Sequence, residues 1–368
     1  MATKRLVSKN VEKKLFLHNT YTSFQYNFLK TKKQELNMKR LVMGAVAAAV
    51  LATSGLAADY TLKFSHVVSD NTPKGKAARF FEQRLEELSG GKIDVQVYPS
   101  SQLYKDNAVL KAIRLDSVQM AAPSFSKFGK IVPQLSIFDL PFLFRDTNHL
   151  HAVQDGTVGE KLKGLVTKKG IVALSFWDNG FKQLSSSKKA LIAPSDAKGQ
   201  KFRIMSSKVL EAQFHAVGAN PQMMPFSEVY SGLQQGVIDG QENTNSNIFT
   251  KKFYEVQKYL TVTNHGYLGY LVVMSKKFWN KLPADLQANV KQAMKEATDE
   301  ERRLAQELND SQFAKIKEYA AKSGKLEIIN LSADQIGAWR TAVSKIYPEF
   351  YSKKTIGEDL IKETINTK

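Results

Sequence analysis

Cysteine is absent from all 368 residues of the chain. Its absence excludes disulfide bonds, thiolate metal sites, thiol catalysis and a lipid anchor attached through cysteine. The glycine motifs that bind phosphates and dinucleotides are also missing, as is the Gly-x-Ser-x-Gly elbow of hydrolases. His149 and His151 are two residues apart, which makes a poor metal pair on a helix. We therefore expect a protein that is not an enzyme and needs no cofactor or metal.

The chain also lacks an apolar run long enough to span a membrane. Its longest run, Leu41–Ala52, falls short of the roughly 20 residues that a spanning helix needs. Two basic residues precede this run, and Gly55 and Ala57 supply small side chains where a signal peptidase cleaves. We interpret residues 38–57 as a signal peptide that directs a free protein to the periplasm. Residues 1–37 show no export pattern, and we interpret them as a misassigned translation start or a disordered extension.

The raw composition suggests a strongly basic protein, with 53 Lys and Arg against 35 Asp and Glu, a net charge of +18. Ten of these basic residues and two of the acids lie in residues 1–57, so residues 58–368 carry 43 and 33, a net +10. Such an excess attracts anions at long range. Its lysines are mixed with acids along predicted helices, as at Lys295 and Glu296, whereas nucleic-acid binding requires a clustered patch. We expect no nucleic-acid partner.

Strand and helix patterns alternate in the first part of this region. Thr61–Ser65 and Ile93–Tyr98 alternate apolar and polar residues, and Pro73–Leu88 between them has apolar residues at helical spacing. Asp106 is expected to open a further helix that runs to Leu115. Strands that alternate with helices indicate an α/β sheet with parallel pairing.

The second part adds strands and one long helix. The strands are expected at 171–177, 181–185, 202–205 and 268–274. From Pro283 to about Ser323 the helical pattern has no internal proline or glycine, and a helix of that length is suited to bracing two lobes. Because no flexible linker separates the lobes, we expect strands to cross between them. Lobe I is predicted at 58–180 plus 269–308, and lobe II at 181–268 plus 309–368.

Three residues stand out as candidates for binding a ligand. Arg203 lies in a short apolar strand, where it either reaches the surface or is held in a cleft. In a cleft its planar group can bind a carboxylate through two parallel hydrogen bonds. Phe226 precedes a predicted helix and is either a hydrophobic staple or a pocket wall. Asn243 follows glycine turns, whose backbone it could simply satisfy, so the residues alone leave both interpretations open.

Longer motifs carry a family resemblance. They are Phe64-Ser65-His66, Tyr98–Leu103, Phe138–Phe142, Pro225–Asn243, Lys252–Leu260 and Thr263-Asn264-His265. Together they resemble the solute-binding proteins of tripartite ATP-independent periplasmic (TRAP) transporters, especially the DctP family of C4-dicarboxylate binders. The resemblance covers essentially all of residues 58–368. It implies an α/β two-lobe periplasmic-binding-protein fold, similar to type II, with strands crossing between lobes and a long bracing helix.

The resemblance also implies roles for individual residues. Arg203 matches the arginine that pairs with the ligand carboxylate, Phe226 the aromatic residue that packs on the ligand, and Asn243 the amide that hydrogen-bonds it. Lys182 falls where relatives that bind sialic acid usually carry a second cationic contact, an arginine.

Four further candidates complete the predicted site. His66 lies at the position of a polar contact from lobe I, and Lys74 is a further candidate cation. Ser124 follows the short buried run Val118–Ala122, the expected third strand, where lobe I faces the cleft. Trp177 is expected to help Phe226 to exclude water. A dianion taken out of water needs paired cations, so we expect either Lys182 or Lys74 to complement the arginine.

The resemblance implies a periplasmic subunit that captures malate, succinate or fumarate by lobe closure and delivers it to the small and large membrane subunits of a TRAP permease. Two alternatives stay open. The same fold binds another organic acid, such as a 2-oxo acid or a sugar acid, or the protein presents its ligand to a membrane kinase as a sensor. We expect a monomer, because a carrier must close and dock.

Overall fold

The structure is a computed structural model that describes residues 58–368. The predicted signal peptide and the segment before it lie outside these described residues. Residues Ala58–Lys368 form one unit, whose strands are β1 (Tyr60–Ser65), β2 (Ile93–Tyr98), β3 (Met120–Ala121), β4 (Ile171–Ser186), β5 (Lys201–Ile204), β6 (Asn220–Met223), β7 (Gly240–Thr244), β8 (Tyr259–Val262), β9 (Tyr267–Ser275) and β10 (Glu327–Asn330).

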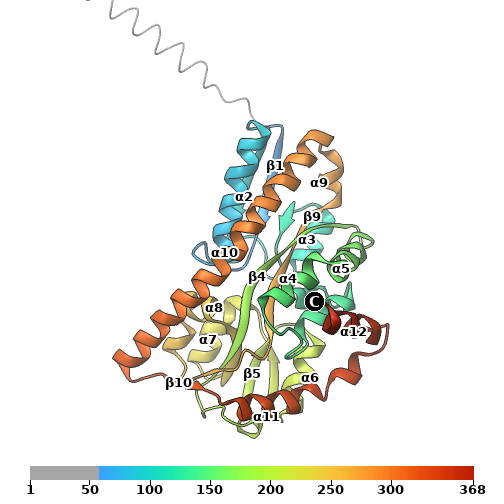
Figure 1. The fold of residues 1–368 in the computed structure, drawn as a ribbon. Helices are drawn as coiled ribbons and strands as arrows, with labels where there is room; N and C mark the ends of the chain where they lie inside the picture. Colours follow the sequence, from blue (N-terminus) through green and yellow to red (C-terminus); the bar gives the residue numbers. More distant parts are fainter. Residues whose placement is uncertain (1–57) are drawn as a thin grey trace, which may run out of the picture. The chain divides into compact units, whose positions relative to one another are not determined.

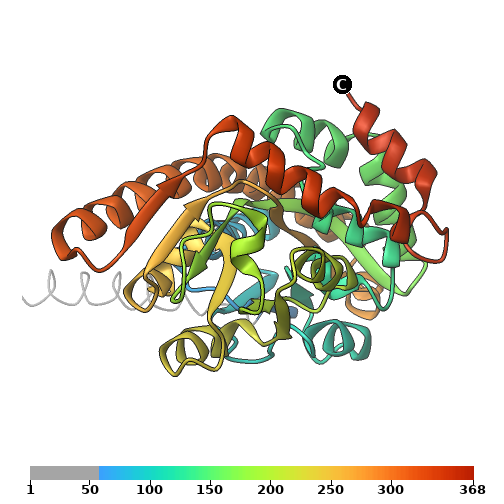
Figure 2. The same ribbon diagram turned by 90° about the horizontal axis from the view of Figure 1, so that it is seen from below.

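Helices cover both faces of the sheet that these strands form (Figures 1 and 2). They are α2 (Pro73–Ser89), α3 (Val109–Leu115), α4 (Thr147–Asp155), α5 (Thr157–Thr167), α6 (Lys208–Ala216), α7 (Val229–Gln234), α8 (Asn245–Thr250), α9 (Lys276–Lys281), α10 (Ala284–Ser323), α11 (Ala333–Ser344) and α12 (Glu358–Asn366). None of the helices between residues 58 and 368 is both long enough and apolar enough to cross a membrane. The α/β class predicted from the sequence is confirmed.

The sheet has two halves that share strand β4. Its main path runs β2-β1-β3-β9-β4-β7-β5-β6, with β8 also pairing with β4 and β10 pairing with β8. Strands β1, β2 and β3 are parallel, as are β5, β6 and β7, which agrees with the predicted pairing. In contrast, β4 runs antiparallel to β9, β7 and β8. The sheet is therefore mixed, because its central strands carry the chain back and forth between the halves.

Strand β4 joins the halves without a break. The part up to Phe181 pairs with β9, whereas the part from Lys182 pairs with β7 and β8. The sequence predicted two separate strands here, and the structure shows one strand of 16 residues with a register shift between Asp178 and Gly180. Gly180 has a φ of +135°, which side chains disfavour. The irregularity therefore lies where β4 changes partners.

Helix α10 spans both halves (Figure 1). It contacts α2 of the first half, β4, and α8 of the second half. Near its start Val290 packs in a core with α2, and near its end Ile316 packs with Phe253. Gly324 ends the helix in the left-handed conformation. The predicted long helix is confirmed, and its contacts suit a brace.

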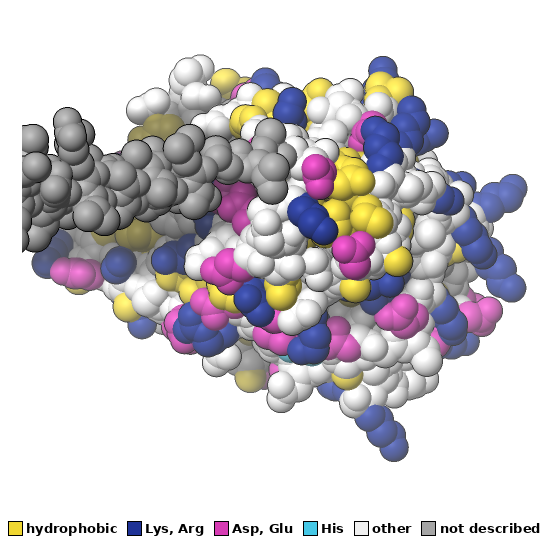
Figure 3. Space-filling view, turned by 90° about the horizontal axis from the view of Figure 1, so that it is seen from above, with side chains coloured by type: hydrophobic (Ala, Val, Ile, Leu, Met, Phe, Trp, Pro, Cys, Tyr) yellow, Lys and Arg dark blue, Asp and Glu magenta, His cyan; other side chains and the backbone are white. Residues whose placement is uncertain are grey.

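The apolar cores lie on the faces of the two sheet halves, and the outer surface is mixed. One core brings Val67 and Val68, from the loop after β1, against Phe226 and Val229 of the second half. The two halves are therefore in contact through apolar side chains. On the face shown in Figure 3, basic and acidic side chains lie interspersed, and the hydrophobic ones gather in small groups.

Candidate ligand-binding cleft

A narrow cavity lies between the two halves of the sheet. It is lined by Val67, Val68, Asp106, Ser124, Arg203, Met205, Phe226, Asn243, Asn247, Leu268 and Tyr270. Its volume of about 20 Å³ has room for about one water molecule. At the surface, Lys105 Nζ meets Glu228 Oε1 at 2.8 Å, across from one half to the other. The halves are therefore closed on each other, and a larger molecule requires them to separate.

Arg203 is the principal cation in this cavity. It stands on β5, with 2% of its surface exposed, and its Nε donates to the Met224 carbonyl oxygen at 3.0 Å. Its terminal nitrogens make no hydrogen bond to any residue between 58 and 368. Burial lowers its pKa to about 10, although Asp106 and Glu242 raise it, so the group stays charged at neutral pH. The guanidinium is thus ready to receive an anion.

Phe226 and Asn243 complete the wall around this guanidinium. The Phe226 ring centroid lies 5.9 Å from Arg203 Cζ. The Asn243 side-chain oxygen accepts from Asn247 Nδ2 at 2.8 Å and from the Thr244 amide at 3.1 Å. Its NH₂ group donates to no residue between 58 and 368 and is therefore available to a ligand. A carboxylate between these residues would meet a cation, an amide donor and an apolar wall.

Lys182 has a different environment from the one expected. Its Nζ lies 2.6 Å from Glu242 Oε1, and His265 Nε2 lies 2.9 Å from the other oxygen of Glu242. Burial raises the pKa of Glu242, but Lys182 and the hydrogen bond from His265 outweigh it and lower the pKa to about 2. Lys182 is therefore already neutralised by a buried carboxylate, and it is not among the residues that line the cavity.

The remaining candidates lie at varying distances from the cavity. Ser124 lines it, and the hydroxyl has no hydrogen-bond partner within residues 58–368. Lys74 Nζ lies over the Tyr270 ring, 3.5 Å from its centroid, and burial lowers its pKa to about 7. His66 is buried beside the lining residue Val67, and burial together with nearby Lys74 lowers its pKa to about 3.

Trp177 does not reach the cavity in this structure. Its ring packs in the core of the first half, 5.9 Å from the ring of Phe64, and its Nε1 donates to Thr298 Oγ1 at 3.0 Å. The indole is completely buried there. Phe226 lines the cavity, whereas Trp177 does not.

Sequence reasoning missed four polar residues in or near the cleft. Asp106 was expected to open a helix, but α3 begins at Val109 and Asp106 lines the cavity. Asn247 and Tyr270 also line it. Lys127 lies behind the wall, with its Nζ 4.0 Å from Asp106 Oδ2. A polar residue just before a helix is ordinarily read as a cap, so the sequence held no signal for Asp106.

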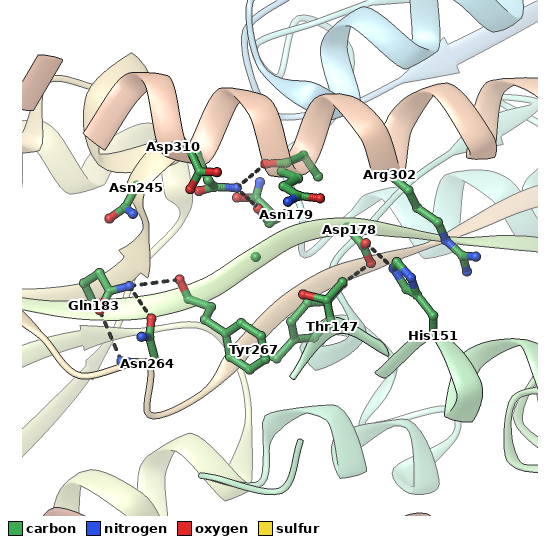
Figure 4. A pocket seen from close by; sticks show the side chains of 15 residues that line it. Thr147, His151, Asp178, Asn179, Gln183, Asn245, Asn264, Tyr267, Arg302 and Asp310 are labelled. Atoms are coloured by element: carbon green, nitrogen blue, oxygen red, sulfur yellow. Dashed lines mark hydrogen bonds and ion pairs between the residues drawn. The ribbon is translucent and has the colours of Figure 1, made fainter. Parts of the chain in front are cut away.

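A larger cavity of about 220 Å³ lies against α10 and is lined by a different set of residues (Figure 4). In it, His151 Nε2 lies 2.6 Å from Asp178 Oδ2, and Tyr267 donates its hydroxyl to the other oxygen of Asp178. Asn179 lines this cavity and also donates to the Tyr270 hydroxyl of the cleft. Across residues 58–368, no three His, Asp or Glu side chains are grouped to hold a metal ion. This second cavity is a polar space beside the strand that joins the halves.

Comparison with known proteins places this geometry among solute-binding proteins. Residues 64–354 match the family model "Bacterial extracellular solute-binding protein, family 7". The chain is 45% identical over 330 residues to the C4-dicarboxylate-binding periplasmic protein DctP of Rhodobacter capsulatus, covering 88% of this chain and 97% of that protein.

Two solved structures extend the comparison. A TRAP periplasmic solute-binding protein from Sulfurospirillum deleyianum with bound succinate is 60% identical, with a TM-score of 0.82, covering 84% of this chain and all of that one. Another, from Pseudomonas aeruginosa with bound L-malate, is 40% identical, with a TM-score of 0.75, covering 79% of this chain and all of that one.

Proposed function

Because the chain belongs to family 7 of the bacterial extracellular solute-binding proteins, we propose that it captures a C4-dicarboxylate such as succinate, malate or fumarate in the periplasm. It then delivers the ligand to the small and large membrane subunits of a TRAP permease. The observation that carries the proposal is the buried, charged Arg203 in the cavity between the two halves. Relatives with bound succinate and malate support the same ligand class.

In this proposal, binding proceeds by closure of two lobes, 58–180 plus 269–308 and 181–268 plus 309–368. The change of partners along β4 supports the boundary between 180 and 181, and the span of α10 suits a brace across both lobes. The C-terminal helix α12, in contrast, packs against α5 of lobe I. In the open form the Arg203 guanidinium is reachable from water. On closure it binds one carboxylate, Asn243 donates its amide to the ligand, and Phe226 excludes water. The ligand favours the closed form by its higher affinity for that form.

A binding protein fits the cleft better than an enzyme does. The charged groups near the cavity are either paired, as Lys182 is with Glu242, or poised for anion recognition, as Arg203 is. General acid–base catalysis instead needs a base within reach of a substrate proton. The relatives at 60% and 40% identity hold succinate and L-malate, which favours a C4 acid over a sugar acid. A sensor role would use the same closure, with a kinase in place of the permease.

Calorimetric titration of residues 58–368, stripped of ligand, tests the proposal. We expect one-to-one binding of a C4-dicarboxylate near the micromolar range, about 8 kcal/mol, and weaker binding of a 2-oxo acid and a sugar acid. Arg203→Ala should weaken binding about 30-fold or more, because the ligand carboxylate loses its buried partner. Lys201→Ala, which removes an exposed cation from the same strand, is the matched control and should bind normally.

Two results would change the conclusion. If no dicarboxylate binds, the ligand is another acid, although the family assignment stands. If Arg203→Ala binds as the wild type does, the site has been misplaced. Transport is tested separately with permease subunits in liposomes, where succinate uptake should require this protein. Uptake that is independent of it would favour the sensor.

A further inference from the structure

The cations around the cleft differ in how far the protein already balances their charges. Lys182 is neutralised by a carboxylate at 2.6 Å. Lys74 lies against the face of Tyr270, and burial brings its pKa to about 7. Arg203 and Lys127 remain, neither with a carboxylate closer than 4.0 Å among residues 58–368. Lys251 Nζ lies 5.3 Å from the Phe226 ring centroid, but Lys251 does not line the cavity. The charge beside Asp106 therefore depends mainly on Arg203 and Lys127.

Lys127 is held where it can act on the cavity. It belongs to the 3₁₀ helix Phe125–Phe128, which follows the lining residue Ser124. Its side chain is only 5% exposed, and its Nζ lies 4.0 Å from Asp106 Oδ2, the outer limit for an ion pair. Burial lowers the pKa of Lys127, Asp106 raises it, and the charge on Arg203 lowers it. The lysine therefore lies within the electrostatic reach of both charged cavity residues.

Asp106 acts on three cations near the cavity, Arg203, Lys127 and Lys74. It lines the cavity together with Arg203 and raises the pKa of that arginine, while it is also the ion-pair partner of Lys127. Asp139 and Glu242 also raise the pKa values of Lys127 and Arg203, respectively, but neither acid lines the cavity. Among residues 58–368, Asp106 is the one acid in the lining, and a single carboxylate does not balance both cations. A long ion pair holds its partners loosely, since Coulomb attraction falls with distance. Lys127 can thus turn to another carboxylate at low cost.

We propose that Lys127 is the second cationic anchor of the site and that its loose pair with Asp106 selects dianions over monoanions. This inference rests on the proposed function. When Arg203 binds one carboxylate of a C4 acid, the other carboxylate reaches the wall that Asp106 occupies. Two carboxylates side by side repel each other unless a cation lies between them. Lys127 is that cation, shared between Asp106 and the ligand, and it takes the place for which Lys182 or Lys74 was expected.

Titration with succinate and butyrate tests this inference, because the two acids have four carbons but differ by one carboxylate. We expect Lys127→Met to weaken succinate binding about 30-fold or more and to change butyrate binding by less than about threefold. The succinate preference should therefore collapse. Lys130→Met, which removes an exposed lysine three residues away, is the control and should keep the preference.

Asp106→Asn gives an independent result. Removing the competing carboxylate should tighten succinate binding, whereas it would weaken binding if Asp106 accepted a hydrogen bond from the ligand. Far-UV circular dichroism and urea unfolding check each variant. If Lys127→Met does not fold, Lys127→Met/Asp106→Asn removes both charges together, and it should bind succinate more weakly than Asp106→Asn alone.

The outcomes separate the inference from the proposed function. A wild type that binds no dicarboxylate overturns the proposed function. A wild type that binds succinate, with a folded Lys127→Met that binds it equally well, overturns only the role of Lys127. Weaker succinate binding by Asp106→Asn also counts against the inference. The substitution removes the carboxylate that is inferred to compete with the ligand for Lys127, so binding should become tighter.

Discussion

The buried carboxylate of Glu242 leads to a quantitative prediction. It is 3% exposed and contacts Lys182 Nζ at 2.6 Å and His265 Nε2 at 2.9 Å. Glu242→Gln keeps the shape of the side chain but leaves the lysine charge buried without a counter-ion. Breaking a buried ion pair from one side costs about 3–5 kcal/mol. We therefore expect the free energy of unfolding to fall by that amount, measured by urea denaturation near pH 7.5.

The pH dependence of this loss follows from the pKa of Glu242. The pKa is about 2 in the folded protein against 4.5 for the free group, so the folded state favours the ionised form. Its contribution is complete above pH 4.5 and disappears as the pH falls toward 2. The difference of 2.5 units corresponds to about 3 kcal/mol. The gap between wild type and Glu242→Gln should therefore stay constant from pH 8 to 5 and narrow below that.

A double-mutant cycle decides whether Lys182 has a structural or a ligand-binding role. We expect Lys182→Met and Glu242→Gln to be destabilising singly and the double variant to lose less than the sum, by about 3 kcal/mol. If the pair is structural, the folded double variant still binds succinate. The ion-pair reasoning would be refuted by additive losses in the double variant. It would also be refuted if the stability difference between the wild type and Glu242→Gln did not change with pH. Loss of succinate binding in a stable double variant would instead return Lys182 to the ligand site.

Two further predictions concern the junction of the halves and the mouth of the cleft. Gly180→Ala should lower the free energy of unfolding in urea by about 1–3 kcal/mol. Its Cβ would lie 2.9 Å from Asn309 Nδ2, at a backbone φ of +135°. Gly337→Ala is the control and should not destabilise the fold, because the space around Gly337 is open. Lys105→Gln removes the exposed contact with Glu228 and should weaken succinate binding at most about fivefold by calorimetry. High salt should abolish that difference, and a loss that persists in salt would argue against a simple surface pair.

The elements predicted well are those whose pattern is local. The helix over Pro283–Ser323 was found because its apolar spacing continues without proline or glycine, and α10 has almost the same bounds. The strands at Ile93–Tyr98 and Leu268–Met274 were found for a similar reason. The continuity of β4 was not predicted. Its irregular middle near Gly180 breaks the alternation of apolar and polar residues, and it is the pairing with partner strands that keeps the backbone extended there.

The site residues were harder to place, because their roles depend on partners far along the chain. Lys182 and Glu242 are 60 residues apart, and only the antiparallel pairing of β4 with β7 brings them together. Asp106 resembled a helix start, although the chain uses it as part of the cavity wall. The family resemblance identified the positions of Arg203 and Asn243. It did not indicate which of the other buried cations are paired with a carboxylate of the protein, as Lys182 is with Glu242.

The balance of buried charge also bears on how tightly such a carrier should bind. In the closed arrangement, without a ligand, Asp106 and Glu242 both stabilise the charge on Arg203. These internal acids lower the cost of burying the guanidinium, so closure does not depend wholly on an anion. They also weaken the attraction that a ligand feels, because the ligand must compete with them for the same cation. A site with uncompensated cations would bind more tightly but release more slowly. We therefore expect an intermediate affinity, set by the internal acids, which would suit the proposed delivery of the ligand to a permease.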